Sequence, residues 1–150
     1  PALERPDGPT LYDSRGITRY LDSLAGGGLY PEAPALWEVL TLEATADGVL
    51  EAAVLMVYEA RFRDESLRSD MWVDAQWQKI SRALDVVEAR WMAHLYGPFG
   101  AAHVGMAAAL GYLDFRHGDR DWRAGRPGLT GWAEKMADRP SIAATLPREA

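Results

Sequence analysis

The chain has 150 residues, of which 48% are hydrophobic and 25% charged; this composition indicates a globular protein with one substantial core and excludes a disordered chain. Its net charge of −6, with acids interrupting the arginine-rich stretches, argues against a nucleic-acid-binding surface, and no apolar run reaches the length of a membrane span. The absence of cysteine excludes a disulfide framework, a thiolate metal site and a catalytic thiol within these residues, which favours a cytoplasmic location.

The first predicted elements are two short strands and a helix. Residues 1–5 (PALER) and 10–13 (TLYD) are extended runs joined by Pro-Asp-Gly-Pro, which predicts a β-hairpin. From Ser14 the apolar residues recur at spacings of three and four, which predicts a helix ended by the glycines at 26–28. Ser14 can cap this helix through its hydroxyl, while Asp13 adds negative charge at the positive end of the helix dipole.

Two long amphipathic helices follow. Residues 35–62 contain no proline and carry one apolar face, which predicts a long helix. The acidic, serine-containing stretch 63–70 breaks the pattern. Apolar residues then step by three and four from Trp77 to Leu95, which predicts a second long helix.

The last third of the chain predicts two more helices. Residues 101–115 are rich in alanine and glycine, and such small side chains suit a buried helix that its neighbours approach closely. Residues 116–127 are polar and predict a loop, and a final amphipathic helix ends before Pro140. The predicted fold class is therefore mainly α: a helical bundle preceded by a partial ββα segment.

Several sequence stretches together resemble glutathione S-transferases. Residues 1–22, with an opening proline, a hairpin, an acidic-Ser pair and the pattern S-x-x-I-x-x-Y-L, resemble the second half of that family's thioredoxin-like domain. Residues 29–31 (LYP) look like its linker, and P-x-L-x-x-W followed by RPS in residues 110–147 is similar to bacterial members. The resemblance implies three parts: a glutathione-binding segment at 1–26, a linker at 27–33 and an all-helical C-terminal domain at 34–150.

The resemblance also implies a function and a ligand site. It predicts a cytoplasmic, homodimeric detoxification enzyme that conjugates glutathione to small electrophiles or reduces them with glutathione, with glutathione as co-substrate, no metal, and neither nucleic acid nor membrane as partner. Ser14 would receive the α-carboxylate of the γ-glutamyl group, and Asp13 would face its ammonium. Pro1 matches the proline that places its preceding residue beside glutathione; the alternative is an ordinary proline at a strand edge.

No residue of the chain is predicted to be catalytic. Family members activate the glutathione thiol with a Tyr, Ser or Cys near the first strand of the thioredoxin-like domain, and these 150 residues contain no match to that strand. With no initial methionine, the N-terminus is expected to be processed or truncated. The competing hypothesis is a non-catalytic binding or scaffold protein with the same fold, since fold alone does not determine function.

Other residues have structural and functional interpretations. Glu43, Asp47 and Glu51 form an acidic row at i, i+4 and i+8; a solvated helix face is preferred over acids that line a cleft. A stripe near the end of the same helix is interpreted as core in preference to a substrate pocket, and it comprises Met56, Tyr58 and Phe62. Four tryptophans on apolar stripes are expected to be packing anchors: Trp37, Trp77, Trp91 and Trp132.

The three histidines, His94, His103 and His117, show no metal-ligand spacing and are interpreted as surface or helix-cap residues. By resemblance, the alanine-rich helix usually begins with Ser or Thr and has Asp three residues later. Gly100 and His103 stand at the matching positions. A protonated histidine would oppose the helix dipole there, so a weakened cap is expected without a change of fold.

Overall fold

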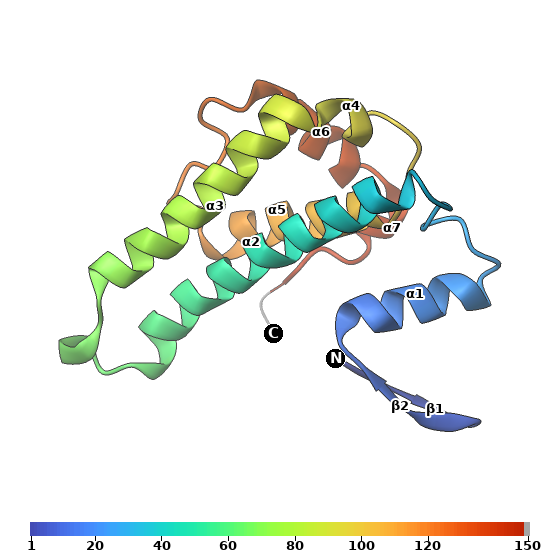
Figure 1. Ribbon diagram of the computed structural model, residues 1–150. Coiled ribbons are helices and arrows are strands. Elements are labelled where there is room, and N and C mark those ends of the chain that lie inside the picture. The colour runs from blue at the N-terminus through green and yellow to red at the C-terminus, as the bar shows by residue number, and fades with distance from the viewer. Residues whose placement is uncertain (149–150) are drawn as a thin grey trace.

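A computed structural model describes residues 1–148 and shows a helical body with a two-stranded hairpin at one side (Figure 1). The predicted fold class is confirmed. The strands are β1 (Ala2–Arg5) and β2 (Gly8–Tyr12), and the helices are α1 (Ser14–Leu24), α2 (Leu36–Phe62), a 3-10 turn (Glu65–Leu67), α3 (Asp70–Arg90), α4 (Met92–Leu95), α5 (Ala101–Arg116), α6 (Pro127–Ala137) and α7 (Pro140–Ala143). Within residues 1–148 no helix is both long and apolar enough to cross a bilayer.

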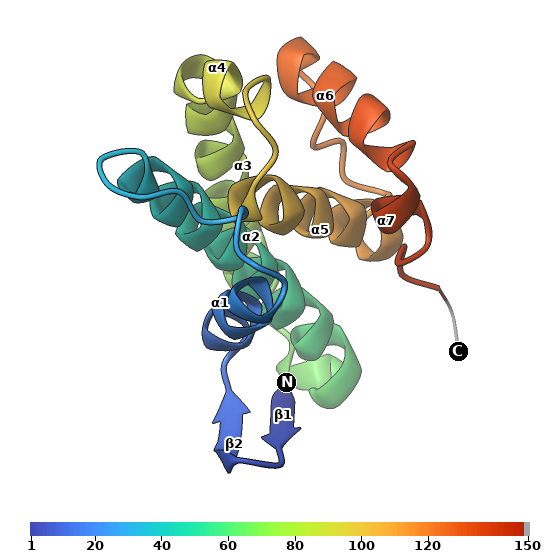
Figure 2. The ribbon, with the colours of Figure 1, turned by 90° about the vertical axis from the view of Figure 1, so that its right-hand side faces the viewer.

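The hairpin projects away from the helices and ends at α1 (Figure 2). Its strands are antiparallel, with Leu3 opposite Leu11 and Arg5 opposite Gly8. The second strand begins two residues earlier than predicted, so the turn is shorter than the four residues of turn-forming sequence. The side chain of Arg5 supports this end, because its Nε donates to the carbonyl of Pro9 at 3.1 Å.

The core lies where α2 packs against α3 and α5. The apolar face predicted for α2 is largely confirmed, since its residues include the fully buried Leu42 and Ala46. The alanine-rich α5 is buried as predicted, and a Cβ built on Gly105 would lie 3.4 Å from the Cβ of Ala46. Small side chains therefore allow α5 to approach α2 closely.

The second long helix is shorter than predicted. The chain leaves helical geometry at Trp91 (φ −117°, ψ 0°), so α3 ends at Arg90 and the short α4 carries Leu95. The tryptophan predictions divide: Trp132 is buried and Trp77 and Trp91 are partly buried, whereas Trp37 is 62% exposed and is not a packing anchor. One strand-like or helical period therefore does not distinguish a buried stripe from its exposed edge at the start of a helix.

The predicted polar loop before α6 contains two buried side chains. Trp122 is 1% exposed and Arg126 is 6% exposed. The indole Nε1 of Trp122 donates to Asp114 at 2.8 Å. The connection is therefore part of the structural core although its composition is that of a surface loop.

The N-terminus of α5 is capped, contrary to the expected weakened cap. Gly100 is the N-cap residue, and its N–H donates to Nδ1 of His103 at 3.2 Å. An accepting Nδ1 means a neutral ring, and burial, assisted by His94, lowers the pKa of His103. His103 therefore replaces the expected carboxylate as a neutral acceptor; it is a buried cap residue, not a surface histidine.

Glycine at position 100 is required by the linker. A Cβ on Gly100 would lie 2.8 Å from the carbonyl oxygen of Leu29, which accepts the N–H of Ala101 at 3.0 Å. Gly100→Ser, which restores the residue usual in the family's cap, is therefore expected to destabilise the protein by about 2 kcal/mol through overpacking. Urea unfolding measures this change; a Gly100→Ser protein more stable than the wild type would contradict it.

Candidate functional site

The site predicted at the start of α1 has an unusual backbone. Asp13 joins β2 to α1 with φ 70° and ψ 126°, a conformation that non-glycine residues rarely adopt. Such a conformation costs about 1–3 kcal/mol and is concentrated at functional sites. Asp13, and not Ser14, is the N-cap residue, because its carboxylate accepts the N–H of Arg15 at 3.0 Å. The capping role predicted for Ser14 is therefore wrong.

Ser14 occupies the first helical position and is exposed. Its hydroxyl has no hydrogen-bond partner within residues 1–148, and its N–H lies at the end of the helix where no intrahelical acceptor exists. Both donors are therefore available to an anion, which the positive end of the helix dipole also favours.

An open hollow of about 530 Å³ lies between the start of α1 and the middle of α2. Its lining combines polar groups at the α1 end with apolar side chains on α2: Asp13, Ser14, Arg15, Asp47, Leu50, Glu51, Val54 and Leu55. Both residues that the resemblance assigns to the γ-glutamyl group of glutathione thus face one space. Pro1, the third predicted site residue, is exposed at the start of the hairpin and does not line this hollow.

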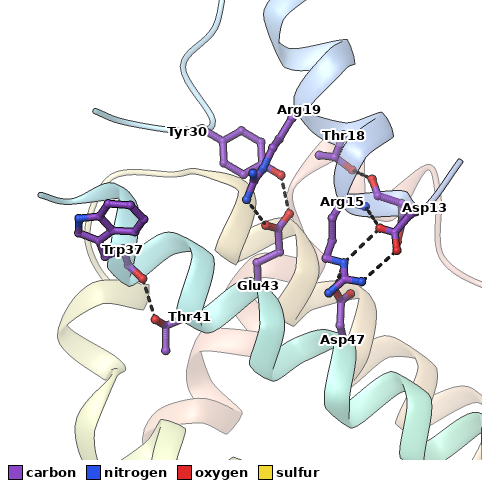
Figure 3. Close-up of polar contacts among 10 residues, drawn as sticks. Asp13, Arg15, Thr18, Arg19, Tyr30, Trp37, Thr41, Glu43 and Asp47 are labelled. Atoms are coloured by element: carbon purple, nitrogen blue, oxygen red, sulfur yellow. Dashed lines mark hydrogen bonds and ion pairs between the residues drawn. The ribbon is translucent and has the colours of Figure 1, made fainter. Parts of the chain in front are cut away.

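Arg15 binds the carboxylate of Asp13 through two nitrogens (Figure 3). Its Nε donates to Oδ1 at 3.1 Å and its Nη2 to Oδ2 at 2.9 Å. Hydrogen bonds from the side chain and backbone of Arg15 lower the pKa of Asp13 to about 2. Asp13 is therefore ionised throughout the physiological range. Sequence reasoning missed Arg15, whose place directly after the acidic-Ser pair was the available signal.

The acidic row of α2 is not a solvated face. Glu43 is 7% exposed and accepts a hydrogen bond from the hydroxyl of Tyr30. Nη2 of Arg19, on α1, lies 3.9 Å from the other oxygen of Glu43. Burial and the contact with Glu43 raise the pKa of Tyr30, so its hydroxyl remains protonated as the donor. Asp47 and Glu51 line the hollow, which fits the less preferred interpretation that these acids border a cleft.

The aromatic stripe near the end of α2 is mostly outside the core. Met56 is buried at 4% exposure, as predicted, but Tyr58 is 50% and Phe62 72% exposed, so the core interpretation is wrong for both. Their rings contact each other edge to face, with centroids 5.1 Å apart. Together with Leu55 they line a second hollow that adjoins the first.

The residues from 1 to 148 contain no group of three or more His, Cys, Asp or Glu side chains placed to hold a metal ion. His117 is buried, and its Nε2 lies 2.9 Å from the carbonyl oxygen of Ala53. The interpretation of His117 as a surface residue is therefore wrong, whereas its place at the C-cap of α5 agrees with a helix-cap role.

The family profile described as glutathione S-transferase, C-terminal domain, matches residues 70–135. The uncharacterized GST-like protein YibF of Escherichia coli K12 is 30% identical over 154 residues, which cover 100% of this chain and 76% of YibF. The chain belongs to the glutathione S-transferase family.

Solved structures of transferases agree. A glutathione transferase family member from Pseudomonas fluorescens Pf-5, with bound S-(propanoic acid)-glutathione, superposes with a TM-score of 0.95 at 45% identity, over 99% of this chain and 77% of that one. A glutathione S-transferase from Methylobacillus flagellatus KT with glutathione bound has a TM-score of 0.89 at 34% identity, over 99% of this chain and 75% of that one. The transferase fold expected from the resemblance is confirmed along nearly the whole chain.

Proposed function

We propose that the protein is a glutathione transferase, which conjugates glutathione to small electrophiles or reduces them at the expense of glutathione. The observation that carries the proposal is the start of α1, where the unpartnered hydroxyl of Ser14 and the ionised Asp13 border one hollow. Transferases 45% and 34% identical to this chain were solved with glutathione or a glutathione conjugate bound, which supports the assignment.

The proposed contacts follow from the charges at the two ends of an amino acid. The α-carboxylate of the γ-glutamyl group accepts hydrogen bonds from the hydroxyl and N–H of Ser14, where the helix dipole favours an anion. The α-ammonium lies against Asp13. Charge-assisted hydrogen bonds of this kind are stronger than neutral ones. Pro1 is proposed to act indirectly, by placing the chain before it along the peptide backbone of glutathione.

The chemical step is nucleophilic. The glutathione thiol loses its proton, the thiolate sulfur forms a bond to an electrophilic carbon, and the leaving group departs with its bonding electrons. The proposal assigns glutathione binding, and no thiol activation, to the residues of this chain. The apolar residues Leu50, Val54 and Leu55 are proposed to contact the electrophile.

The organisation predicted from the resemblance remains part of the proposal. Residues 1–26 would belong to the glutathione-binding domain, 27–33 to the linker and 34–150 to the helical domain of a cytoplasmic, homodimeric detoxification enzyme. Supporting observations are the exposure of Leu21 and Leu24 on α1 and of Tyr58 on α2, since a monomer would leave these apolar side chains in water.

Ser14→Ala provides the test. In the full-length protein, calorimetry is expected to show glutathione binding that falls by about tenfold in Ser14→Ala, the cost of one hydrogen bond to a charged group. Turnover of a generic aromatic electrophile should fall in parallel. The melting temperature should stay unchanged, because Asp13 supplies the cap.

Ser23→Ala is the matched control, because Ser23 lies on the same helix and donates only to the carbonyl of Tyr20 at 2.7 Å. A Ser14→Ala protein with lower melting temperature and unchanged affinity would show a structural role and contradict the assignment. A wild-type protein that neither binds glutathione nor turns over the electrophile would support the scaffold hypothesis.

A further inference from the structure

We propose that Asp47 of α2 is a positioning residue for glutathione, which holds Arg15 and through it the binding carboxylate of Asp13. The inference rests on the proposed function and deepens it. It assigns to the helical domain a direct part in shaping a site whose ligand contacts lie on α1. The three side chains form one chain of contacts from α2 to the start of α1 (Figure 3).

The first step is the charge balance of Asp47. Its Oδ2 is buried and accepts no hydrogen bond within residues 1–148. The ion pair to Nε of Arg15, at 3.6 Å, is its one contact with a cation within 4.0 Å in that part of the chain. Burial raises the pKa of Asp47, as expected for a carboxylate with incomplete compensation. Arg15 is therefore the group that compensates this charge.

The second step is the double use of Arg15. The same Nε that lies 3.6 Å from Asp47 donates to Oδ1 of Asp13 at 3.1 Å. A planar guanidinium with fixed donor directions restricts the carboxylates that it joins. Attraction to Asp47 thus keeps Arg15, and with it the strained Asp13, at the edge of the hollow.

The third step is the weak packing of α1. The helix contains no buried residue, so core packing does not fix its position relative to α2. Polar contacts to α2 have this role: Arg15 to Asp47 near its start and Arg19 to Glu43 one turn later. Loss of Asp47 should therefore loosen the start of α1, where Asp13 and Ser14 lie, without unfolding the helical body.

Asp47→Asn in the full-length protein tests the inference. Its Kd and KM for glutathione are expected to rise about three- to tenfold, in the range of a partly buried ion pair, with kcat nearly unchanged. The melting temperature should remain that of the wild type. Glu38→Gln is the matched control: Glu38 is an exposed acid on the same helix, outside the hollow, and its loss should leave glutathione binding unchanged.

A double-mutant cycle identifies the route. If Asp47 acts through Arg15, Asp47→Asn should have no further effect in an Arg15→Met background, where the bridge is already lost. Equal losses in both backgrounds would show that Asp47 acts on glutathione without Arg15, and would overturn the proposal. So would wild-type affinity in Asp47→Asn. If the wild type itself fails to bind glutathione, the proposed function fails instead, so the two failures are distinguishable.

Discussion

Replacing Arg126 with methionine is expected to lower the free energy of unfolding by about 3 kcal/mol, the lower end of the range for breaking a buried charge pair. Arg126 is 6% exposed and joins the loop before α6 to α3. Its Nη1 donates to the carbonyl of Trp122 at 2.6 Å, and its Nη2 donates to Oγ of Ser81 at 2.6 Å. The same Nη2 lies 2.7 Å from Oδ1 of Asp85. Methionine fills a similar volume but leaves these acceptors without their donors.

The measurement is urea unfolding of the wild type and two variants. Arg120→Met is the control, since Arg120 pairs with the exposed Asp74 at 3.1 Å, and losing such a surface pair costs about 1 kcal/mol or less. Arg126→Lys keeps the charge but lacks the branched donors, so it should fall between the wild type and Arg126→Met. Equal stability losses in Arg126→Met and Arg120→Met would contradict a structural role for the buried network.

The importance of Arg126 illustrates what sequence patterns omit. Residues 116–127 are polar and aperiodic, which predicts a loop, and the structure has a loop there. Burial of Trp122 and Arg126 depends on α3, whose Ser81 lies 45 residues from Arg126 in sequence. No local pattern carries information on such a partner. Long-range contacts of this kind explain why the elements were predictable and the polar core of the loop was not.

The helical body was predictable because its periodicity is strong. α1 and α2 begin and end within about a residue of the predictions, since apolar spacing, glycines and prolines all act locally. The interruption at Trp91 was missed because the apolar steps continue through it into α4. Periodicity reports which residues face the core, and it does not report a change of direction that keeps the same face buried.

The candidate site shows the same division. Asp13 and Ser14 were identified from their order before a helix, and the physics of capping and of anion binding applied to both interpretations. The positive φ of Asp13 decided which residue caps the helix, and nothing in its side chain predicts that angle. Glu43 was expected in solvent because acidic rows usually are exposed. Its burial depends on Tyr30 in the linker and Arg19 on α1, both outside its own helix.

Trp132→Ala is expected to have the largest effect on stability, about 4 kcal/mol, because truncating a buried tryptophan removes its apolar contacts and leaves a cavity. Trp132 is 3% exposed on α6, and its Nε1 donates to the carbonyl of Leu95 at 2.8 Å. Its ring centroid lies 6.2 Å from that of His103. The side chain therefore connects α6 with α4 and with the cap of α5.

Two further variants separate packing from the hydrogen bond of the indole. Trp132→Phe keeps most of the ring and loses the donor, so thermal or urea unfolding should show a loss of about 1–2 kcal/mol. Trp37→Ala, at a 62% exposed position, should change stability by about 0.5 kcal/mol or less. If Trp132→Phe were as unstable as Trp132→Ala, the bond to Leu95, and not the volume of the ring, would hold α6 in place. The expected order places packing first, because a cavity beside His103 cannot be filled without moving α5, whose cap is already in contact with the linker carbonyl of Leu29.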